Sequence, residues 1–107
     1  MTTAATDPLG AVADVRSKNA GPFWLTLDVF AEDKATYDRI AVSPVTDPAT
    51  IGQLYAVDPA TVRVFRLPAL LAVKVSFPRP VVQGSLHDRD MHAGQQHVPL
   101  LDLPVPA

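Results

Sequence analysis

The run from Arg16 to Phe23, with the letters RSKNAGPF, combines the residue types of an anion-binding loop. Arg holds a carboxylate or phosphate through two parallel hydrogen bonds, and Lys adds a compact positive charge. An Asn and a Gly that tolerate positive φ precede a Pro that fixes the exit, which is typical of a stiff turn at a strand end. The run is a solvated turn, an anion-binding loop or a docking loop for a protein partner. In the last two cases the binding residues are Arg16, Ser17, Lys18, Asn19 and Gly21. No base neighbours Ser17 along the chain, so we do not expect a nucleophile there.

Three histidines, His87, His92 and His97, recur at five-residue intervals near the C-terminus. Imidazole titrates near neutrality, so His92 and His97 are candidate acid–base residues. Intervals of five put no two histidines on the same face of a helix, and zinc ligands are usually separated by two to four residues. We therefore favour hydrogen-bonding roles over a metal site, and we expect no cofactor. Polar neighbours that would orient a ligand or a partner peptide are Asp90, Gln95 and Gln96.

Asp28 lies in the middle of an alternating segment, Trp24–Phe30, that predicts a half-buried strand. Lys74 lies in the middle of a second such segment, Leu71–Phe77. If the two strands are neighbours, these side chains form a cross-strand ion pair. The other interpretation is a catalytic carboxylate, which makes Asp28 the third catalytic candidate after the two histidines.

Composition limits the classes of function. The chain has 107 residues, a formal net charge of −2 and no cysteine, so we expect a single domain without disulfides. Nucleic-acid binding normally needs a basic face, and a membrane span needs about 18 consecutive apolar residues, which the sequence lacks. We expect no nucleic-acid partner and no membrane. The N-terminus lacks the pattern of a signal peptide, so the expected compartment is the cytoplasm.

The predicted elements place these residues in an α+β domain. Apolar periodicity and caps predict two helices in the middle of the chain, with strands on both sides and a long irregular C-terminal arm. This order favours a mainly antiparallel sheet with two helices on one face. Residues 1–8 form a tail and residues 9–107 the domain. The expected segments are strands Leu9–Arg16, Trp24–Phe30, Val62–Leu67, Leu71–Phe77 and Leu100–Val105, helices Asp33–Val42 and from Asp47, and a long loop over residues 81–99.

Three segments together resemble a small bacterial family of unknown function. They are the Arg16–Phe23 run with the strand that follows it, the Pro78-Arg79-Pro80 stretch, and the tail from Gly94 to Asp102. Members of that family are typically encoded beside a larger protein that resembles acyclic terpene utilisation protein A. The layout is also remotely similar to the C-terminal ferredoxin-like domain of that larger protein, although Asn19-Ala20-Gly21 departs from its acidic, glycine-flanked run.

The resemblance implies a small subunit of a two-component enzyme. It would dock on a larger acyclic terpene utilisation protein A-like subunit and complete a site for a carboxylate or acyl-CoA-type substrate, in chemistry of the hydratase or lyase class. One alternative is a stand-alone small lyase or hydratase, with His92 or His97 as base and Arg16 holding a carboxylate. Another is a homo-oligomeric anion-binding module without catalysis. Whether the chain is an enzyme by itself stays open.

Overall fold

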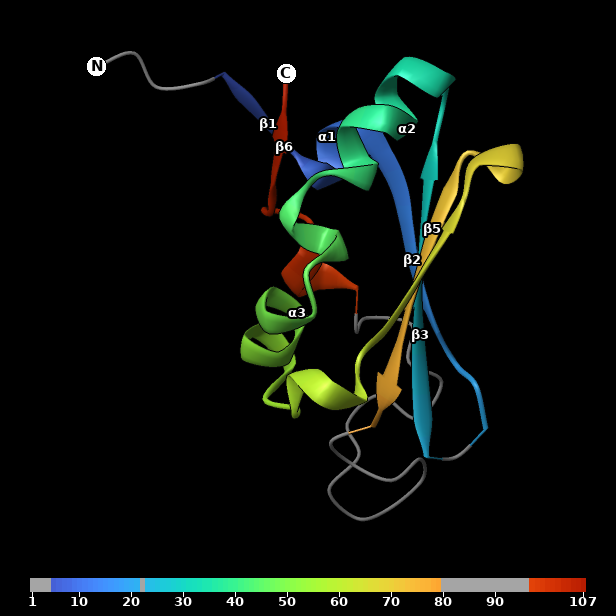
Figure 1. The fold of residues 1–107 in the computed structure, drawn as a ribbon, viewed down its shortest axis with the longest axis vertical. Coiled ribbons are helices and arrows are strands. Elements are labelled where there is room, and N and C mark those ends of the chain that lie inside the picture. The colour runs from blue at the N-terminus through green and yellow to red at the C-terminus, as the bar shows by residue number, and fades with distance from the viewer. Residues whose placement is uncertain (1–4, 22, 80–96) are drawn as a thin grey trace.

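The computed structural model describes residues 5–21, 23–79 and 97–107. Strands and helices alternate with short 3-10 turns, so the structure is α+β as predicted (Figure 1). The elements are β1 (Thr6–Pro8), α1 (Leu9–Val12), β2 (Ala13–Asn19), β3 (Trp24–Ala31), α2 (Lys34–Ala41), η1 (Pro44–Thr46), α3 (Pro48–Tyr55), η2 (Pro59–Thr61), β4 (Arg63–Leu67), η3 (Pro68–Leu70), β5 (Ala72–Pro78), η4 (Val98–Leu100) and β6 (Pro104–Pro106). None of the helices in these ranges combines the length and apolar character needed to cross a membrane.

The main sheet has four strands in the order β2-β3-β5-β4, and all its neighbours are antiparallel, as predicted. Two hairpins, β2–β3 and β4–β5, lie side by side through β3 and β5, and the helices connect them. A ferredoxin-like domain has the order β-α-β-β-α-β. Here the order around the helices is strand–strand–helix–helix–strand–strand, so the likeness concerns the fold class and not the connectivity.

Helices α2 and α3 each begin after a capping aspartate, and the sequence had predicted a cap at the second of these. Asp33 accepts a hydrogen bond from the backbone N–H of Thr36 at 2.8 Å. This hydrogen bond is the main reason that the pKa of Asp33 lies below its ordinary value. Asp47 accepts from the N–H of Ala49 at 3.0 Å, and a proline at the first helical position follows it. Asp58 repeats this capping for η2, accepting from the N–H of Ala60.

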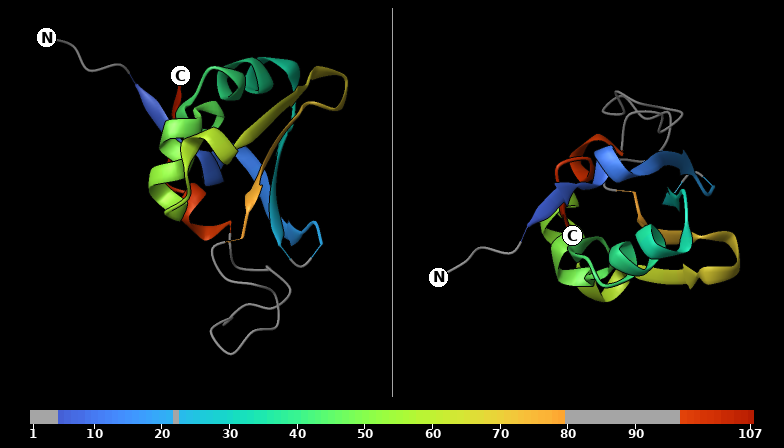
Figure 2. Two further views of the ribbon diagram at one scale, coloured as in Figure 1. Left: turned by 60° about the horizontal axis from the view of Figure 1, so that its bottom comes forward. Right: turned by 90° about the horizontal axis from the view of Figure 1, so that it is seen from above.

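The hydrophobic core lies between one face of the sheet and the helical layer. The strands curve around the helices, and no described element lies on the other face (Figures 1 and 2). The rings of Tyr55 and Phe77 meet at 4.8 Å between centroids. Alternate residues of the two central strands point into this core, together with apolar residues of both helices and of the chain ends. The fully buried ones include Leu9, Leu25, Leu27, Val29, Ile40, Val45, Ile51, Val73, Val75, Phe77, Leu100 and Val105.

The two chain ends form a small sheet of their own. Strand β1 pairs antiparallel with β6, so residues Thr6–Pro8, assigned to a tail from the sequence, are a strand. The last strand was expected over Leu100–Val105, but it is shorter and pairs with β1 instead of the main sheet. Arg39 of α2 joins both strands, because its guanidinium contacts Asp7 Oδ2 at 2.6 Å and the carbonyl of Pro106 at 2.5 Å.

The predicted first strand, Leu9–Arg16, is wrong at both ends. Its first four residues form helix α1, and the strand itself runs from residue 13 to Asn19. The helical turn is favoured by a distant segment, since the N–H groups of Leu9 and Gly10 donate to the carbonyls of Leu103 and Leu101 at 2.8 and 2.9 Å. The strand extends further than predicted because its ladder with β3 continues until Asn19 lies opposite Leu25.

Candidate functional site

The first half of the run predicted as a loop at Arg16–Phe23 is strand, since β2 continues to Asn19, and this divides the candidate residues. Side chains of successive strand residues point to opposite faces of a sheet. Arg16 and Lys18 therefore lie on the face away from the helices, and Ser17 and Asn19 lie on the helical side. Only the turn at its end has the predicted conformation, with Gly21 at φ +82°. Four of the five residues proposed to act together thus form two separate pairs on opposite faces, and Gly21 lies in the turn beyond them.

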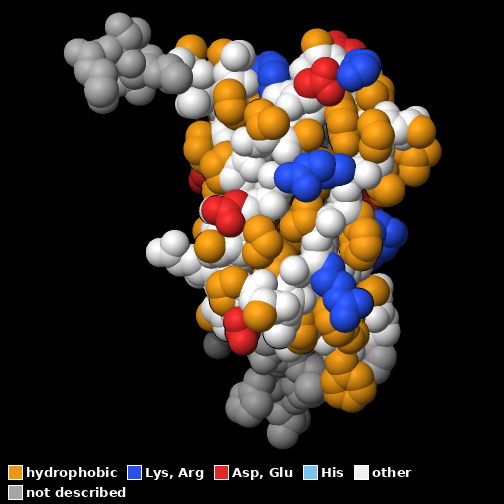
Figure 3. Space-filling view, viewed as in Figure 1, with side chains coloured by type: hydrophobic (Ala, Val, Ile, Leu, Met, Phe, Trp, Pro, Cys, Tyr) orange, Lys and Arg blue, Asp and Glu red, His pale blue; other side chains and the backbone are white. Residues whose placement is uncertain are grey.

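The face away from the helices, which we call the open face, carries most of the exposed charge and aromatic surface of the sheet. Figure 3 has the same view as Figure 1, with the helices on the left and the strands on the right. In its middle and lower parts, Lys and Arg side chains lie over the strands and acidic side chains over the helical side. The cations and aromatic residues of the open face are Arg16, Lys18, Arg63, Lys74, Trp24, Phe30 and Phe65.

Asp28 lies at the centre of the open face. Arg16 is directly opposite it on β2 and Lys74 directly opposite on β5, so the predicted neighbourhood of Asp28 and Lys74 is confirmed. The ion pair is formed by a different residue, because Lys18 Nζ lies 3.2 Å from Asp28 Oδ2. Arg16 turns instead to Asp14 on its own strand, with Nη2 3.0 Å from Oδ2. The Asp28 side chain is only 12% exposed, so this carboxylate is covered by its neighbours.

A shallow hollow of about 410 Å³ lies beside Asp28 on the open face. Its floor contains a hydrogen bond of 3.0 Å between the hydroxyls of Thr26 and Ser76. Next to the hollow, the guanidinium of Arg63 lies over the ring of Trp24 at 5.5 Å from the centroid. The lining residues are Thr26, Phe65, Leu67, Lys74 and Ser76. The sequence does not predict this hollow, because its residues come from three strands and only Lys74, in the middle of a strand, gave any signal of it.

The second group lies on the helical side, at the end of the sheet where β2 and β5 finish. The backbone N–H of His97 donates to Ser17 Oγ at 3.1 Å, and Ser17 Oγ lies 3.3 Å from His97 Nδ1. The guanidinium of Arg79 donates to the side-chain carbonyl of Asn19 at 2.6 Å, and the N–H of Arg79 donates to the carbonyl of Phe23 at 2.7 Å. Arg79 is only 9% exposed. We call Ser17, Asn19, Arg79 and His97 the inner cluster.

The inner cluster corrects one expectation and adds one residue. No base was expected beside Ser17. His97 lies next to it in the structure, although the two residues are 80 positions apart in the sequence. Arg79 was missed because Pro78-Arg79-Pro80 indicated only the end of a strand. A hydroxyl, an amide, a guanidinium and an imidazole are the donors that bind carboxylate and thioester oxygens. The same contacts also anchor η4, because the residue before it, His97, is bonded to β2 through both backbone and ring.

The two catalytic candidates that the structure describes, Asp28 and His97, do not meet. Asp28 lies on the open face and His97 on the helical side of the sheet. His92 lies outside the described residues, as do His87, Asp90, Gln95 and Gln96, so their proposed acid–base, hydrogen-bonding and ligand-orienting roles remain predictions.

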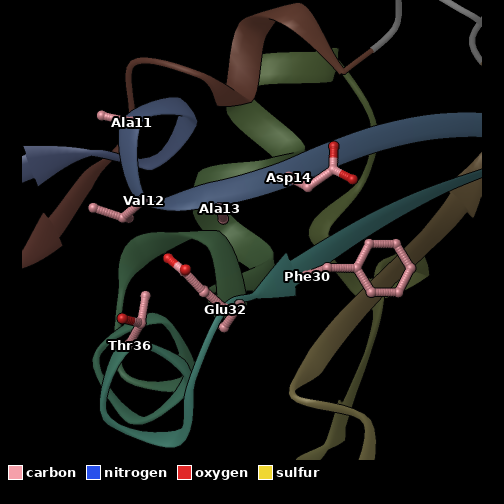
Figure 4. Close-up of a pocket in the computed structure, with 8 residues that line it drawn as sticks. Ala11, Val12, Ala13, Asp14, Phe30, Glu32 and Thr36 are labelled. Carbon is pink, nitrogen blue, oxygen red and sulfur yellow. The ribbon is translucent and has the colours of Figure 1, made fainter.

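A second hollow, of about 520 Å³, lies where β2 begins and β3 ends (Figure 4). Asp14 and Phe30 line one part of it, and Glu32 and Thr36 line another beside the start of α2. In Figure 4 the Asp14 carboxylate points away from Glu32. None of the residues proposed from the sequence lines this hollow.

Fold and clusters together define a small α+β domain whose antiparallel sheet is covered on one face and bears charged and aromatic side chains on the other. The chain belongs to the family described as a domain of unknown function, DUF4387, whose model matches residues 9–104. No curated protein and no solved structure matches the chain.

Proposed function

We propose that this chain is a cytoplasmic small subunit of a two-component enzyme. It docks through its open face on a larger catalytic subunit that resembles acyclic terpene utilisation protein A. The resemblance of the sequence motifs motivates the identity of the partner. The observation that carries the proposal is the sheet itself, with one face packed on helices and the other left without a described covering element.

A sheet face that only meets water is normally lined by polar side chains that alternate with the core residues. The open face departs from this pattern, since Phe30 and Phe65 are 40% and 46% exposed on it. Phe23, at the end of the same sheet, is 61% exposed. Aromatic and Arg side chains together are the types enriched at protein interfaces. These properties support a face that is buried in an assembly.

In this proposal the inner cluster contributes part of the substrate site. Hydration and elimination next to a carboxylate or thioester need a proton-transfer group and donors that hold the substrate oxygens. His97 is the described proton-transfer group, and Ser17 and Asn19 lie beside it on one strand. The inner cluster lies on the helical side at the end of the sheet, so a larger subunit seated on the open face must extend past the ends of β2 and β5 to supply the remaining groups of this half-site.

The test is to purify the tagged chain from its own cells and weigh the intact assembly by native mass spectrometry. The expected result is a stoichiometric complex with one larger protein. The paired change Arg16→Glu and Lys18→Glu should abolish that complex, and Lys34→Glu, on α2, should leave it intact. A chain that runs only as a monomer or homo-oligomer under these conditions would overturn the proposal.

A stand-alone lyase or hydratase is the second candidate, favoured by the contact between Ser17 and His97 within one chain. The structure argues against Arg16 as the carboxylate-binding residue next to His97, because Arg16 pairs with Asp14 on the opposite face of the sheet. Turnover by the purified chain that His97→Ala abolishes without unfolding would establish this candidate. A homo-oligomeric anion-binding module would appear in the native mass measurement as copies of this chain alone.

A further inference from the structure

We infer that the hollow at Lys74 is the centre of the docking surface and that it binds an acidic side chain of a protein partner. This inference rests on the proposed function only in that the partner is a protein subunit. It adds the place of contact and the chemistry of the partner's surface.

Lys74 lies in the middle of β5, between Asp28 on one neighbouring strand and Phe65 on the other. Asp28 is the nearest acid in the sheet register, and its carboxylate is already held by Lys18 at 3.2 Å. Within the described ranges, Lys74 forms no ion pair and no side-chain hydrogen bond. Its charge therefore lies in a hollow with an apolar wall on one side and a pair of hydroxyls in its floor.

The charge of the open face differs in sign from that of the rest of the chain. Among the residues that the structure describes, it holds four Lys and Arg side chains and two Asp side chains, so their formal charge is +2, whereas that of the whole chain is −2. Two copies packed face to face by a two-fold axis would set these positive faces against each other. An acidic protein surface is complementary to the open face and is the favoured occupant.

The aromatic residues of the open face fit a protein better than a single-stranded nucleic acid. Stacking of bases needs free aromatic faces, but the ring of Trp24 is already covered by the guanidinium of Arg63. Phe65 and Leu67 form an apolar wall beside the Lys74 ammonium. A Glu or Asp side chain with an apolar neighbour matches this combination of charge and apolar surface.

Carbodiimide cross-linking tests the inference directly, because it joins an ammonium to a carboxylate only where the two touch. The assembly, purified from its own cells by a gentle tag, is treated with carbodiimide, digested and analysed by peptide mass spectrometry. We expect an isopeptide bond between Lys74 and an Asp or Glu of the larger protein. Lys34, exposed on α2 and paired with Asp38, is the internal control and should not be linked to that protein.

Two variants complete the test. Lys74→Gln keeps most of the side-chain stem without the charge, and Lys74→Glu reverses it; we expect at least tenfold and about a hundredfold weaker capture of the larger protein, respectively. Circular dichroism and thermal unfolding verify that both variants fold. A partner that is captured unchanged by both variants, without a Lys74 cross-link, would overturn this inference and leave the proposed function standing. Absence of any partner protein would overturn both. Cross-links from Lys74 to a second copy of the chain would also show the inference to be wrong. So would nucleic acid that co-purifies with the chain and is absent from the Lys74→Glu variant.

Discussion

The ion pair between Lys18 and Asp28 offers the sharpest test of the open face in the isolated chain. The pair joins an exposed ammonium to a carboxylate that is only 12% exposed, at 3.2 Å. Two further cations, Arg16 and Lys74, lie opposite Asp28 on its two neighbouring strands. A double-mutant cycle with Lys18→Met, Asp28→Asn and the double variant measures the coupling between the two side chains.

The expected magnitude lies between the exposed and buried limits. Fully exposed pairs contribute about 0.2–1 kcal/mol, and removing one partner of a fully buried pair costs about 3–5 kcal/mol. Lys18 is exposed, and Arg16 and Lys74 remain near the carboxylate when Lys18 is replaced, so we expect values near the exposed limit. Lys18→Met should lower the free energy of unfolding by about 1 kcal/mol and Asp28→Asn by about 1.5 kcal/mol, because the second change leaves three cations without their central anion. The coupling should be about 1 kcal/mol. The melting temperature should fall by roughly 4–8 °C for Lys18→Met and by roughly 6–12 °C for Asp28→Asn.

Urea unfolding, followed by the fluorescence of Trp24, the only tryptophan in the chain, gives these free energies. Measurements at about 20 mM and about 500 mM NaCl separate the ionic contribution, because screening at the higher salt should reduce the coupling by roughly half. The exposed pair Lys34–Asp38 provides the control, and Lys34→Met should cost about 0.3 kcal/mol. A coupling below about 0.3 kcal/mol that does not change with salt would refute the electrostatic account of the open face.

Three further changes test other parts of the structure. Gly52→Ala should lower the free energy of unfolding by about 1–3 kcal/mol, because the added Cβ would lie 2.8 Å from the carbonyl of Val57; a higher melting temperature would contradict this contact. Burial raises the pKa of Tyr55, so this phenol stays neutral in the folded chain while it ionises in the unfolded chain above about pH 10. Stability should therefore decrease as pH rises above about 10, and less steeply in Tyr55→Phe, as urea unfolding across this range would measure. Ser17→Ala removes the side-chain oxygen bonded to His97 and should speed amide hydrogen exchange at that residue; unchanged protection would argue against the anchoring role.

Local chemistry was enough to predict the central elements. Strand β3 follows from its strict alternation of apolar residues, and α3 follows from Asp47 and the proline after it, which satisfy the first N–H groups of a helix. The antiparallel sheet and the helices on one face could be inferred from the order of these elements. The sequence also placed Asp28 and Lys74 in the middle of alternating strands, but their neighbourhood was conditional on a strand order that only the structure supplied.

Long-range pairing decided the rest. The hydrogen-bonded pairing of β2 with β3 continues as far as Asn19. The first half of the predicted loop is therefore strand, and Arg16 and Ser17 point to opposite faces of the sheet. The contact between Ser17 and His97 joins residues 80 positions apart, and no local pattern reports such a distance. Likewise, no local pattern predicts that the N–H of Leu9 donates a hydrogen bond to the carbonyl of Leu103. By itself the sequence determined the fold class, the caps and the charged and aromatic residues, because these depend on neighbours along the chain. Only the tertiary structure decided which of them share a face, because strand register and the return of the C-terminal segment set those distances.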